Sequence, residues 1–364
     1  MSADMIILLV VVLLLLLLAF ETPVAYCLTI SGTVGLILLH GFKYANSTLG
    51  GIPFTSTNSF VLTVLPTFIL IGVFAVSGGI ARQMFAISTY VFRRLPGGMG
   101  AATVMACAGF AAVTGSSVAA SAAMAQLSVG EMIKYGYRPS FASGLVAAAG
   151  TLGVMIPPSI ILVLYAVITG ESPAAMLAAG IIPGLLTAVA YTIYVLVRAR
   201  KMTEINAAQL AQVLAADVRE SNQARVRVGA SDATTPGGPA ASEITLRQLP
   251  WRGLVRIGII FLIILGGIYS GVFTVTESGA IGALAAGVMM IIELRKTGLR
   301  KILQAIRKSL LETAATTSMV FAIVVGSAIF SVFLVSSRAP QQLAQAVGAL
   351  DVPPAVIVII FLLI

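Results

Sequence analysis

Long apolar runs separated by short polar stretches dominate the sequence. Several of these runs approach the length of about 20 residues that an α-helix needs to cross a lipid bilayer. They lack the two-residue alternation of apolar and polar side chains that is typical of a transmembrane β-strand. We therefore predict an all-α, polytopic membrane protein. The predicted membrane helices cover residues 5–20, 24–40, 61–76, 141–169, 174–197, 254–273, 278–292 and 314–335, and a last apolar run begins at residue 354.

Three stretches between these runs have other patterns. Residues 41–59 are rich in Gly, Ser, Thr and Asn, so we expect an irregular loop outside the membrane. Residues 80–95 carry apolar side chains at helical spacing among arginines, which predicts a helix that lies in the membrane interface. Residues 199–250 are polar and include a TTPGGP motif, so we interpret them as a cytoplasmic linker, with a short helix at 207–216.

Composition and charge agree with a membrane protein. Hydrophobic residues make up 59% of the 364 residues and charged residues only 10%, which excludes an ordinary soluble domain. The net charge is +9, but the basic residues flank apolar runs, so the charge indicates topology and not a nucleic-acid site. With the N-terminus outside, these flanks all fall on the cytoplasmic side, and only Lys43 and Arg338 fall outside. The flanking residues are Arg82, Arg93, Arg94, Lys134, Arg138, Arg198, Arg200, Lys201, Arg247, Arg252, Arg256, Arg295, Lys296, Arg300, Lys301, Arg307 and Lys308.

A cluster of small and polar residues interrupts the apolar segment 101–130. The sequence TGSS at 114–117 separates 101–113 from 118–127, and each flank is too short to span a bilayer comfortably. We predict a re-entrant helical hairpin over about 101–130 that enters from the cytoplasm and returns. The alternative is that Ser116 and Ser117 are small packing residues at a membrane helix interface.

A second interruption lies inside the apolar run 141–169. The sequence GTLG at 150–153 is followed by Pro157-Pro158-Ser159, and proline cannot continue a helix because it lacks the N–H and clashes with the preceding turn. Broken backbone at membrane depth is tolerated only where it is buried in protein or lines a cavity. Discontinuous helices of this kind build the midplane sites of secondary transporters.

The two halves of the chain resemble each other weakly. FETP at 20–23 and FTVTE at 273–277 each follow the first helix of a half, and residues 74–83 resemble 333–342 where an apolar helix passes into an amphipathic one. An odd number of predicted crossings separates the halves, so the repeat is expected to be inverted across the membrane. We assign 1–198 to a first membrane repeat and 251–364 to a second, incomplete one.

Three motifs resemble the large permease subunit of TRAP transporters, the tripartite ATP-independent periplasmic systems of the DctM-like family. They are GSSVA at 115–119, AAGTLGVMIPPS at 148–159 and GVFTVTE at 271–277, and the resemblance covers essentially the whole chain. The family has a second re-entrant hairpin and a second Pro-Pro break beyond this point. The resemblance therefore implies that the C-terminal part of the second repeat is missing.

The resemblance implies a function as well as a fold. Such permeases use a sodium gradient to import organic acids such as C4-dicarboxylates or sialic acid across the bacterial inner membrane. A periplasmic substrate-binding protein delivers the substrate, and a small four-helix permease subunit accompanies the large one. The fold resembles an elevator-type symporter, and the predicted topology places the N-terminus in the periplasm.

The residue chemistry fits a sodium-coupled carrier. Sodium is a hard cation that prefers oxygen ligands. Hydroxyl groups and freed backbone carbonyls around the two interruptions could supply them. We therefore predict a sodium site formed by Gly115, Ser116, Ser117, Gly150 and Thr151. The sequence indicates no cofactor and no other metal site.

A substrate carboxylate is expected at the N-terminus of a half-helix, where free N–H groups and the helix dipole favour an anion. The predicted substrate-binding residues are Ser117, Pro158 and Ser159. Glu21 and Glu277 stand at helix junctions, where they serve either as interfacial caps or in ion coupling.

Other functions were weighed against this one. A divalent-anion/sodium symporter is also built with re-entrant hairpins but needs no periplasmic binding protein. A truncated, non-transporting structural membrane subunit is an alternative of another class, because the second repeat is incomplete. An intramembrane enzyme is disfavoured, since the sequence offers no paired carboxylates and no Ser/His pair. The cysteines, Cys27 and Cys107, are interpreted as apolar packing residues.

Overall fold

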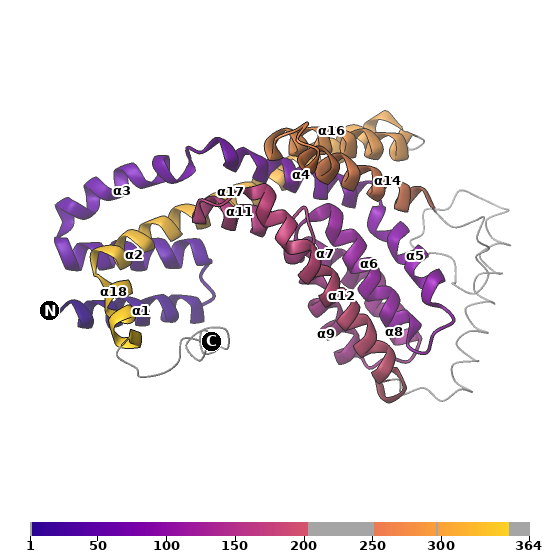
Figure 1. Cartoon of the computed structure of the whole chain (residues 1–364), viewed down its shortest axis with the longest axis horizontal. Helices are drawn as coiled ribbons and strands as arrows, with labels where there is room; N and C mark the ends of the chain where they lie inside the picture. The colour runs from indigo at the N-terminus through magenta and orange to yellow at the C-terminus, as the bar shows by residue number, and fades with distance from the viewer. Residues whose placement is uncertain (1, 203–250, 296–297, 349–364) are drawn as a thin grey trace. The chain divides into compact units, whose positions relative to one another are not determined.

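The computed structural model describes residues 2–202, 251–295 and 298–348, and the regular structure of these residues is helical (Figure 1). The prediction of an all-α protein is confirmed. The helices group into two compact units. Unit 1 takes the chain up to Phe60 together with the part from Ala315 onward, and unit 2 takes Val61–Ala314. This division differs from the two predicted repeats, and each unit contains helices from both of them.

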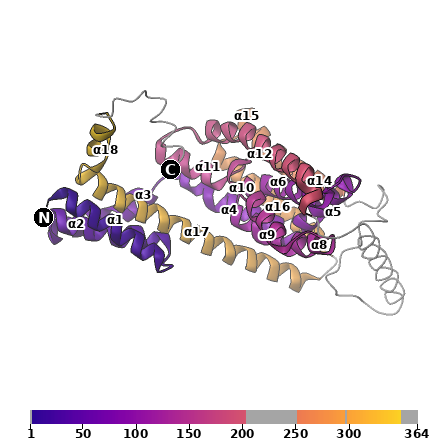
Figure 2. The same ribbon diagram turned by 90° about the horizontal axis from the view of Figure 1, so that it is seen from below.

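Unit 1 is built on a pair of apolar helices that are connected by a short turn. The chain leaves them through a third helix and returns at the far end of the sequence, where the second part of a long helix packs against α2. Figure 2 shows the second part of this helix, α17, beside α2. The helices are α1 (Ala3–Ala19), α2 (Val24–His40), α3 (Phe42–Thr57), the second part of α17 (Leu299–Ser336) and α18 (Ala339–Gly348).

Small residues allow α2 and α17 to approach closely. A Cβ on Gly32 would lie 2.9 Å from the Cα of Phe330, and a Cβ on Gly35 would overlap the ring of Phe333. From the other side, a Cβ on Gly326 would lie 2.6 Å from the carbonyl oxygen of Ala25. Packing through small residues is how helices associate in a membrane, where no hydrophobic force drives them together.

The expectation of an irregular loop over residues 41–59 was wrong. The structure forms helix α3 there, with Pro53 inside it. The hydroxyls that suggested a loop bond back along the helix, since Thr57 donates to the carbonyl of Pro53 at 2.6 Å and Ser56 to that of Ile52 at 2.6 Å. Such back-bonding satisfies a polar side chain within the helix, so Ser and Thr do not by themselves end it.

Unit 2 holds both predicted interruptions. Most of its helices are short, and the breaks between them bring helix ends into the interior of the unit. The elements are η1 (Phe60–Thr63), α4 (Val64–Ser77), α5 (Ile80–Phe92), α6 (Gly98–Thr114), α7 (Ser117–Met124), η2 (Ala125–Val129), α8 (Gly130–Lys134), α9 (Pro139–Gly150), α10 (Leu152–Met155), α11 (Ile160–Thr169), α12 (Pro173–Met202), α14 (Trp251–Phe261), η4 (Leu262–Gly266), α15 (Gly267–Tyr269), α16 (Val275–Leu294) and the first part of α17.

The predicted membrane helices agree with the observed elements. Four helices are long and apolar enough to cross a membrane: Phe60–Ser77, Pro173–Arg198, Val275–Leu294 and Leu299–Ser336. A fifth candidate is the bent pair Pro139–Met155 and Ile160–Thr169. α1 and α2 match their predicted runs within two residues, and α5 forms where an amphipathic helix was expected. The final apolar run and most of the predicted linker, including 207–216, lie outside the described residues.

The helix junctions repeat in a way that fits an internal duplication. Glu21 follows the end of α1 by two residues with φ 58°, and Gly271 follows the end of α15 by two residues with φ 73°. Gly79 and Arg338 stand in the same relation to α4 and α17, with φ values of 73° and 57°. In unit 2, α4 packs against α16, as α17 packs against α2 in unit 1. The inversion of this repeat across the membrane stays a prediction.

Candidate functional site

The first interruption is a sharp reversal between α6 and α7. Gly115 ends α6 in the left-handed conformation, with φ 58°, and donates its N–H to the carbonyl of Ala111 at 2.9 Å. Ser116 is extended, and its hydroxyl accepts the N–H of Ala119 at 3.3 Å, which makes it the N-cap of α7. Helices α6 and α7 contact each other on either side of this turn, and the helical segments around it cover 98–134. That this hairpin is re-entrant and enters from the cytoplasm stays a prediction.

The second interruption separates α10 from α11. The helical direction changes by 46° between Pro139–Met155 and Ile160–Thr169, so the helix is interrupted where the prolines predict it. That the two parts form one broken membrane span stays a prediction. Ile156 and Ser159, at the two ends of the break, have extended backbone, and the chain bends between them, where the Pro157–Pro158 bond is cis. A shorter irregularity at Thr151 divides the first part into α9 and α10.

The two interruptions touch each other through their backbones. The N–H of Ile160, at the start of α11, donates to the carbonyl of Gly115 at 3.2 Å. A Cβ on Gly115 would overlap the carbonyl oxygen of Pro158, and a Cβ on Gly153 would lie 2.8 Å from the carbonyl carbon of Ser116. Only glycine fits these two positions without moving backbone, and Gly115 also needs its positive φ. We call this contact between 115–117 and 153–160 the crossing.

Two further glycines bring neighbouring helices close to the crossing. A Cβ on Gly150 of α9 would overlap the hydroxyl of Ser121 and lie 3.2 Å from its Cα. A Cβ on Gly72 of α4 would lie 3.0 Å from the Cα of Thr114. Gly72 and Ser121 were not predicted as site residues, because their only local signal is that they are small residues in apolar helices.

The sequence that forms these breaks matches a known protein family. Residues 11–364 match the family model described as "Tripartite ATP-independent periplasmic transporter, DctM component". The chain belongs to this family. It is a multi-pass membrane protein of the TRAP permease type, and the resemblance drawn from its three motifs is confirmed.

Curated relatives of the family cover different substrates. The chain is 31% identical to the C4-dicarboxylate TRAP transporter large permease protein DctM of Pseudomonas aeruginosa, over 83% of this chain and 62% of the relative. It is 28% identical to the sialic acid TRAP transporter large permease protein SiaM of Vibrio cholerae, over 93% and 70%. It is 27% identical to the ectoine/5-hydroxyectoine permease UehC of Ruegeria pomeroyi, over 91% and 69%. The chain thus spans less than two thirds of the length of the Pseudomonas relative.

The family motifs fall at the breaks of this TRAP permease chain. Two of them form the crossing, and the third begins α16. There Thr274 is the N-cap, and the Glu277 carboxylate accepts the N–H of Thr274 at 2.8 Å and its hydroxyl at 2.8 Å. Glu277 therefore acts as a cap, one of its two predicted roles. Glu21 stands beyond the last residue of α1 with a positive φ.

The predicted sodium ligands are only partly gathered at the crossing. Gly115, Ser116 and Ser117 form the tip of the hairpin, and Ser117 is half-buried. Gly150 packs one turn further along α7, against Ser121. The Thr151 side chain is exposed, and its hydroxyl donates to the carbonyl of Ala148 at 2.6 Å.

The predicted substrate residues differ in whether their hydrogen-bonding groups are already bonded within the protein. Ser159 is fully buried, and its hydroxyl donates to the carbonyl of Val154 at 2.5 Å and accepts the N–H of Leu162 at 3.4 Å. Because the N–H of Ile160 is bonded to Gly115, the first turn of α11 is largely satisfied by protein groups. The first turn of α7 is more open, since Val118 is 78% exposed.

The oxygen atoms around the crossing are hydroxyls and carbonyls. Among the described residues, no three His, Cys, Asp or Glu side chains come together as a metal site. The C-terminal carbonyls of α6 and α10 and the N-terminal N–H groups of α7 and α11 meet within one region of unit 2. This arrangement offers partial negative charge to a cation and partial positive charge to an anion over a short distance.

Proposed function

We propose that this chain forms the large membrane subunit of a sodium-coupled secondary transporter that imports organic acids. In this proposal a periplasmic binding protein delivers the substrate and a small four-helix permease subunit completes the assembly. The protein lies in the bacterial inner membrane with its N-terminus in the periplasm. It undergoes an elevator-type movement, a feature carried over from the family resemblance.

The crossing is the observation that supports this proposal. Four helix ends meet at backbone distance, held by the bond from Ile160 to Gly115. Helix ends leave N–H and carbonyl groups without partners inside their own helices. Secondary transporters use such half-helices to hold an anionic substrate and a coupling ion in the middle of the membrane.

The sodium ion is assigned to the carbonyl side of the crossing. The carbonyls at Gly115 and Gly150, together with the hydroxyls of Ser116, Ser117 and Thr151, form the proposed ligand set. Thr151 would have to turn its hydroxyl away from Ala148, to which it now donates at 2.6 Å. Ser117 needs no such change, because its hydroxyl makes no hydrogen bond to another described residue.

The carboxylate is assigned to the first turn of α7. Both Ser117 and Ser159 were predicted to bind it, but the Ser159 hydroxyl already bonds to Val154 and Leu162. We therefore give Ser159 and Pro158 a positioning role, in which they shape the start of α11. The named substrates of the relatives support an acidic ligand, since C4-dicarboxylates, sialic acid and ectoine all carry a carboxylate.

The test is reconstitution of the full-length protein with its small subunit in liposomes. Uptake of a radiolabelled C4-dicarboxylate is followed with and without an inward sodium gradient, and with and without the periplasmic binding protein. The proposal expects uptake only when both are present. Uptake without the binding protein would instead identify the symporter alternative, and absence of uptake under every condition and with every organic acid tried would favour a structural subunit.

A further inference from the structure

The first part of α17, residues 299–314, has three distinct faces along one helix. The first face is buried against the rest of unit 2. Ser309 is fully buried and its hydroxyl lies 3.1 Å from the hydroxyl of Ser77 at the end of α4, and Thr313 is 7% exposed. This contact fixes the rotation of the helix, because it sets which side chains turn inward.

The second face carries leucines that remain outside the fold. Leu299, Leu303 and Leu310 are 75%, 61% and 51% exposed, and their spacing places them on one side of the helix. Exposed large apolar side chains in a row mark a surface that contacts lipid or another apolar surface.

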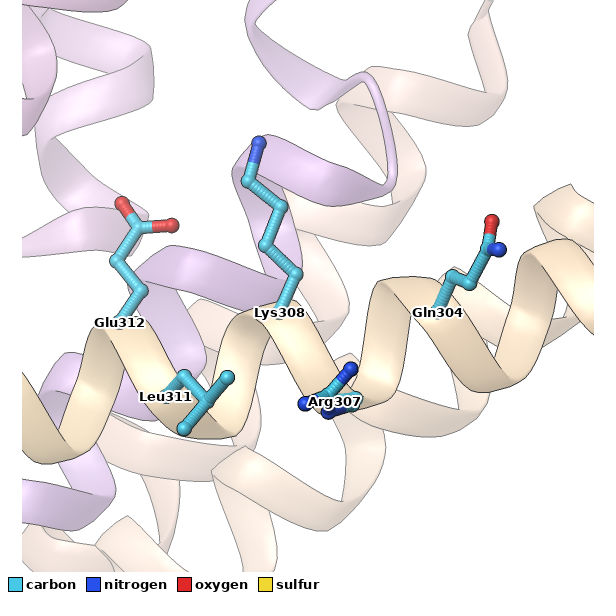
Figure 3. A pocket seen from close by; sticks show the side chains of 5 residues that line it. All are labelled: Gln304, Arg307, Lys308, Leu311 and Glu312. Carbon is cyan, nitrogen blue, oxygen red and sulfur yellow. The ribbon is translucent and has the colours of Figure 1, made fainter.

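The third face is cationic. It contains a pocket lined by Gln304, Arg307, Lys308, Leu311 and Glu312 (Figure 3). In Figure 3 the side chains of Gln304, Lys308 and Glu312 rise from successive turns of α17, and those of Arg307 and Leu311 lie on the front of the helix. Arg300 and Lys301 precede Arg307 and Lys308 by seven residues, two helical turns, so all four cations share this side.

The two cations that line the pocket are available to a ligand. Arg307 and Lys308 are exposed, and neither forms an ion pair with another residue in the described part of the chain. The Lys308 ammonium and the Glu312 carboxylate rise from neighbouring turns without meeting (Figure 3). Two basic side chains and one carboxylate line the pocket, and Arg300 and Lys301 lie two turns before the two cations, so the pocket is complementary to an anion.

The length of α17 places this segment at the membrane boundary. Its 38 residues extend about 57 Å at 1.5 Å per residue, whereas the hydrocarbon core of a bilayer is about 30 Å thick. The charged first part cannot lie inside that core. The contact of Ser309 with Ser77 sets it level with the end of α4, a predicted membrane helix.

From these faces we propose that the first part of α17 binds the headgroup of an anionic phospholipid. The lipid phosphate contacts Arg307 and Lys308, with the Gln304 amide as a further donor. The acyl chains lie along Leu311 and the neighbouring leucine face. A helix with a leucine face beside a cationic face is the form that interfacial lipid-binding helices take.

A tryptophan placed in the pocket tests this inference. In the full-length protein, Trp251→Phe removes the single tryptophan of residues 1–364, any tryptophan outside them is also replaced by Phe, and Leu311→Trp adds one at a position that is 60% exposed. The protein is reconstituted into phosphatidylcholine bilayers that contain brominated phosphatidylglycerol, whose bromines quench nearby tryptophan. A matched probe, Leu186→Trp on α12, reports lipid at a position that is 67% exposed.

The expected result is stronger quenching by brominated phosphatidylglycerol than by brominated phosphatidylcholine at position 311, and no preference at position 186. Arg307→Ala with Lys308→Ala should weaken the preference roughly fivefold for each charge removed. Glu312→Gln should strengthen it, because it removes a charge that repels phosphate. The pair Arg93→Ala and Arg94→Ala, which removes two adjacent exposed cations elsewhere, should change nothing.

Three results would overturn the inference. One is equal quenching by both lipids at position 311. Another is loss of the preference in 10 mM inorganic phosphate without a matching effect of sodium chloride, which would identify a site for free phosphate. The third is loss of the preference when the small permease subunit is present, which would identify a protein surface as the occupant.

Discussion

Replacing Gly115 by alanine tests whether the crossing depends on a close backbone approach. Gly115 has φ 58°, and its added Cβ would overlap the carbonyl oxygen of Pro158. Both obstacles are backbone, so no side chain can swing away to make room. Gly170→Ala is a matched control, because Gly170 also ends a helix, has φ 74°, and has open space where the Cβ would be.

The magnitude follows from these two sites. An alanine in the left-handed conformation costs about 1–2 kcal/mol, and Gly170→Ala should show that cost alone. Gly115→Ala adds an overlap worth about 1–3 kcal/mol. If the overlap breaks the bond from the Ile160 N–H to the Gly115 carbonyl, an unsatisfied buried donor adds about 1–3 kcal/mol more. The total is about 3–8 kcal/mol.

The native cysteines supply the assay. Cys27 and Cys107 are both free and buried, and Cys107 lies in α6, about two helical turns before the crossing. In a background with Cys27→Ser and with any cysteine outside residues 1–364 replaced by Ser, a thiol-reactive fluorophore added to the detergent-purified protein reports the temperature at which Cys107 becomes accessible. We expect Gly115→Ala to lower that temperature much further than Gly170→Ala. Equal shifts in the two variants would refute the argument that the breaks touch through backbone.

The remaining predictions use the same full-length protein. Ser117→Ala and Thr151→Val should each raise the sodium concentration for half-maximal uptake by less than tenfold, since a lost neutral ligand costs about 1 kcal/mol, and unchanged sodium dependence in both would remove the ligand assignment. Thr274→Ala should destabilise the fold by about 1 kcal/mol through loss of the α16 N-cap, measured by thermal unfolding, with no change expected if the cap is dispensable. Ser231→Cys and Thr297→Cys should escape an impermeant thiol reagent in intact cells, and labelling of either would reverse the predicted topology.

The helices and their breaks could be predicted from the sequence because both have local causes. An apolar run of sufficient length predicts a membrane helix wherever it occurs, and α2 begins and ends at the predicted residues. Proline ends or bends a helix through its own ring and its missing N–H. The break near Pro157 could therefore be predicted without knowing which other helices contact it. The TGSS interruption was visible for a similar reason, since both flanking segments are short.

Where local signals conflict, the sequence was a poorer guide. Residues 42–57 contain glycine, proline and several hydroxyls, all of which suggested a loop, yet they form α3. The hydroxyls bond to carbonyls within the helix, and that outcome depends on side-chain conformations that composition does not reveal. The hydroxyl of Ser159 is a related case, because only the structure shows that it already forms hydrogen bonds with Val154 and Leu162.

The partners of each break were decided by the tertiary structure alone. Gly115 and Ile160 are far apart along the chain, and nothing in either motif says that the N–H of one meets the carbonyl of the other. Gly72 and Ser121 are small residues among many in this sequence, and their neighbours become known only when the helices pack. A small side chain permits a close approach without specifying what approaches, so the sequence determines where helix ends are free and the packing of unit 2 determines which ends meet.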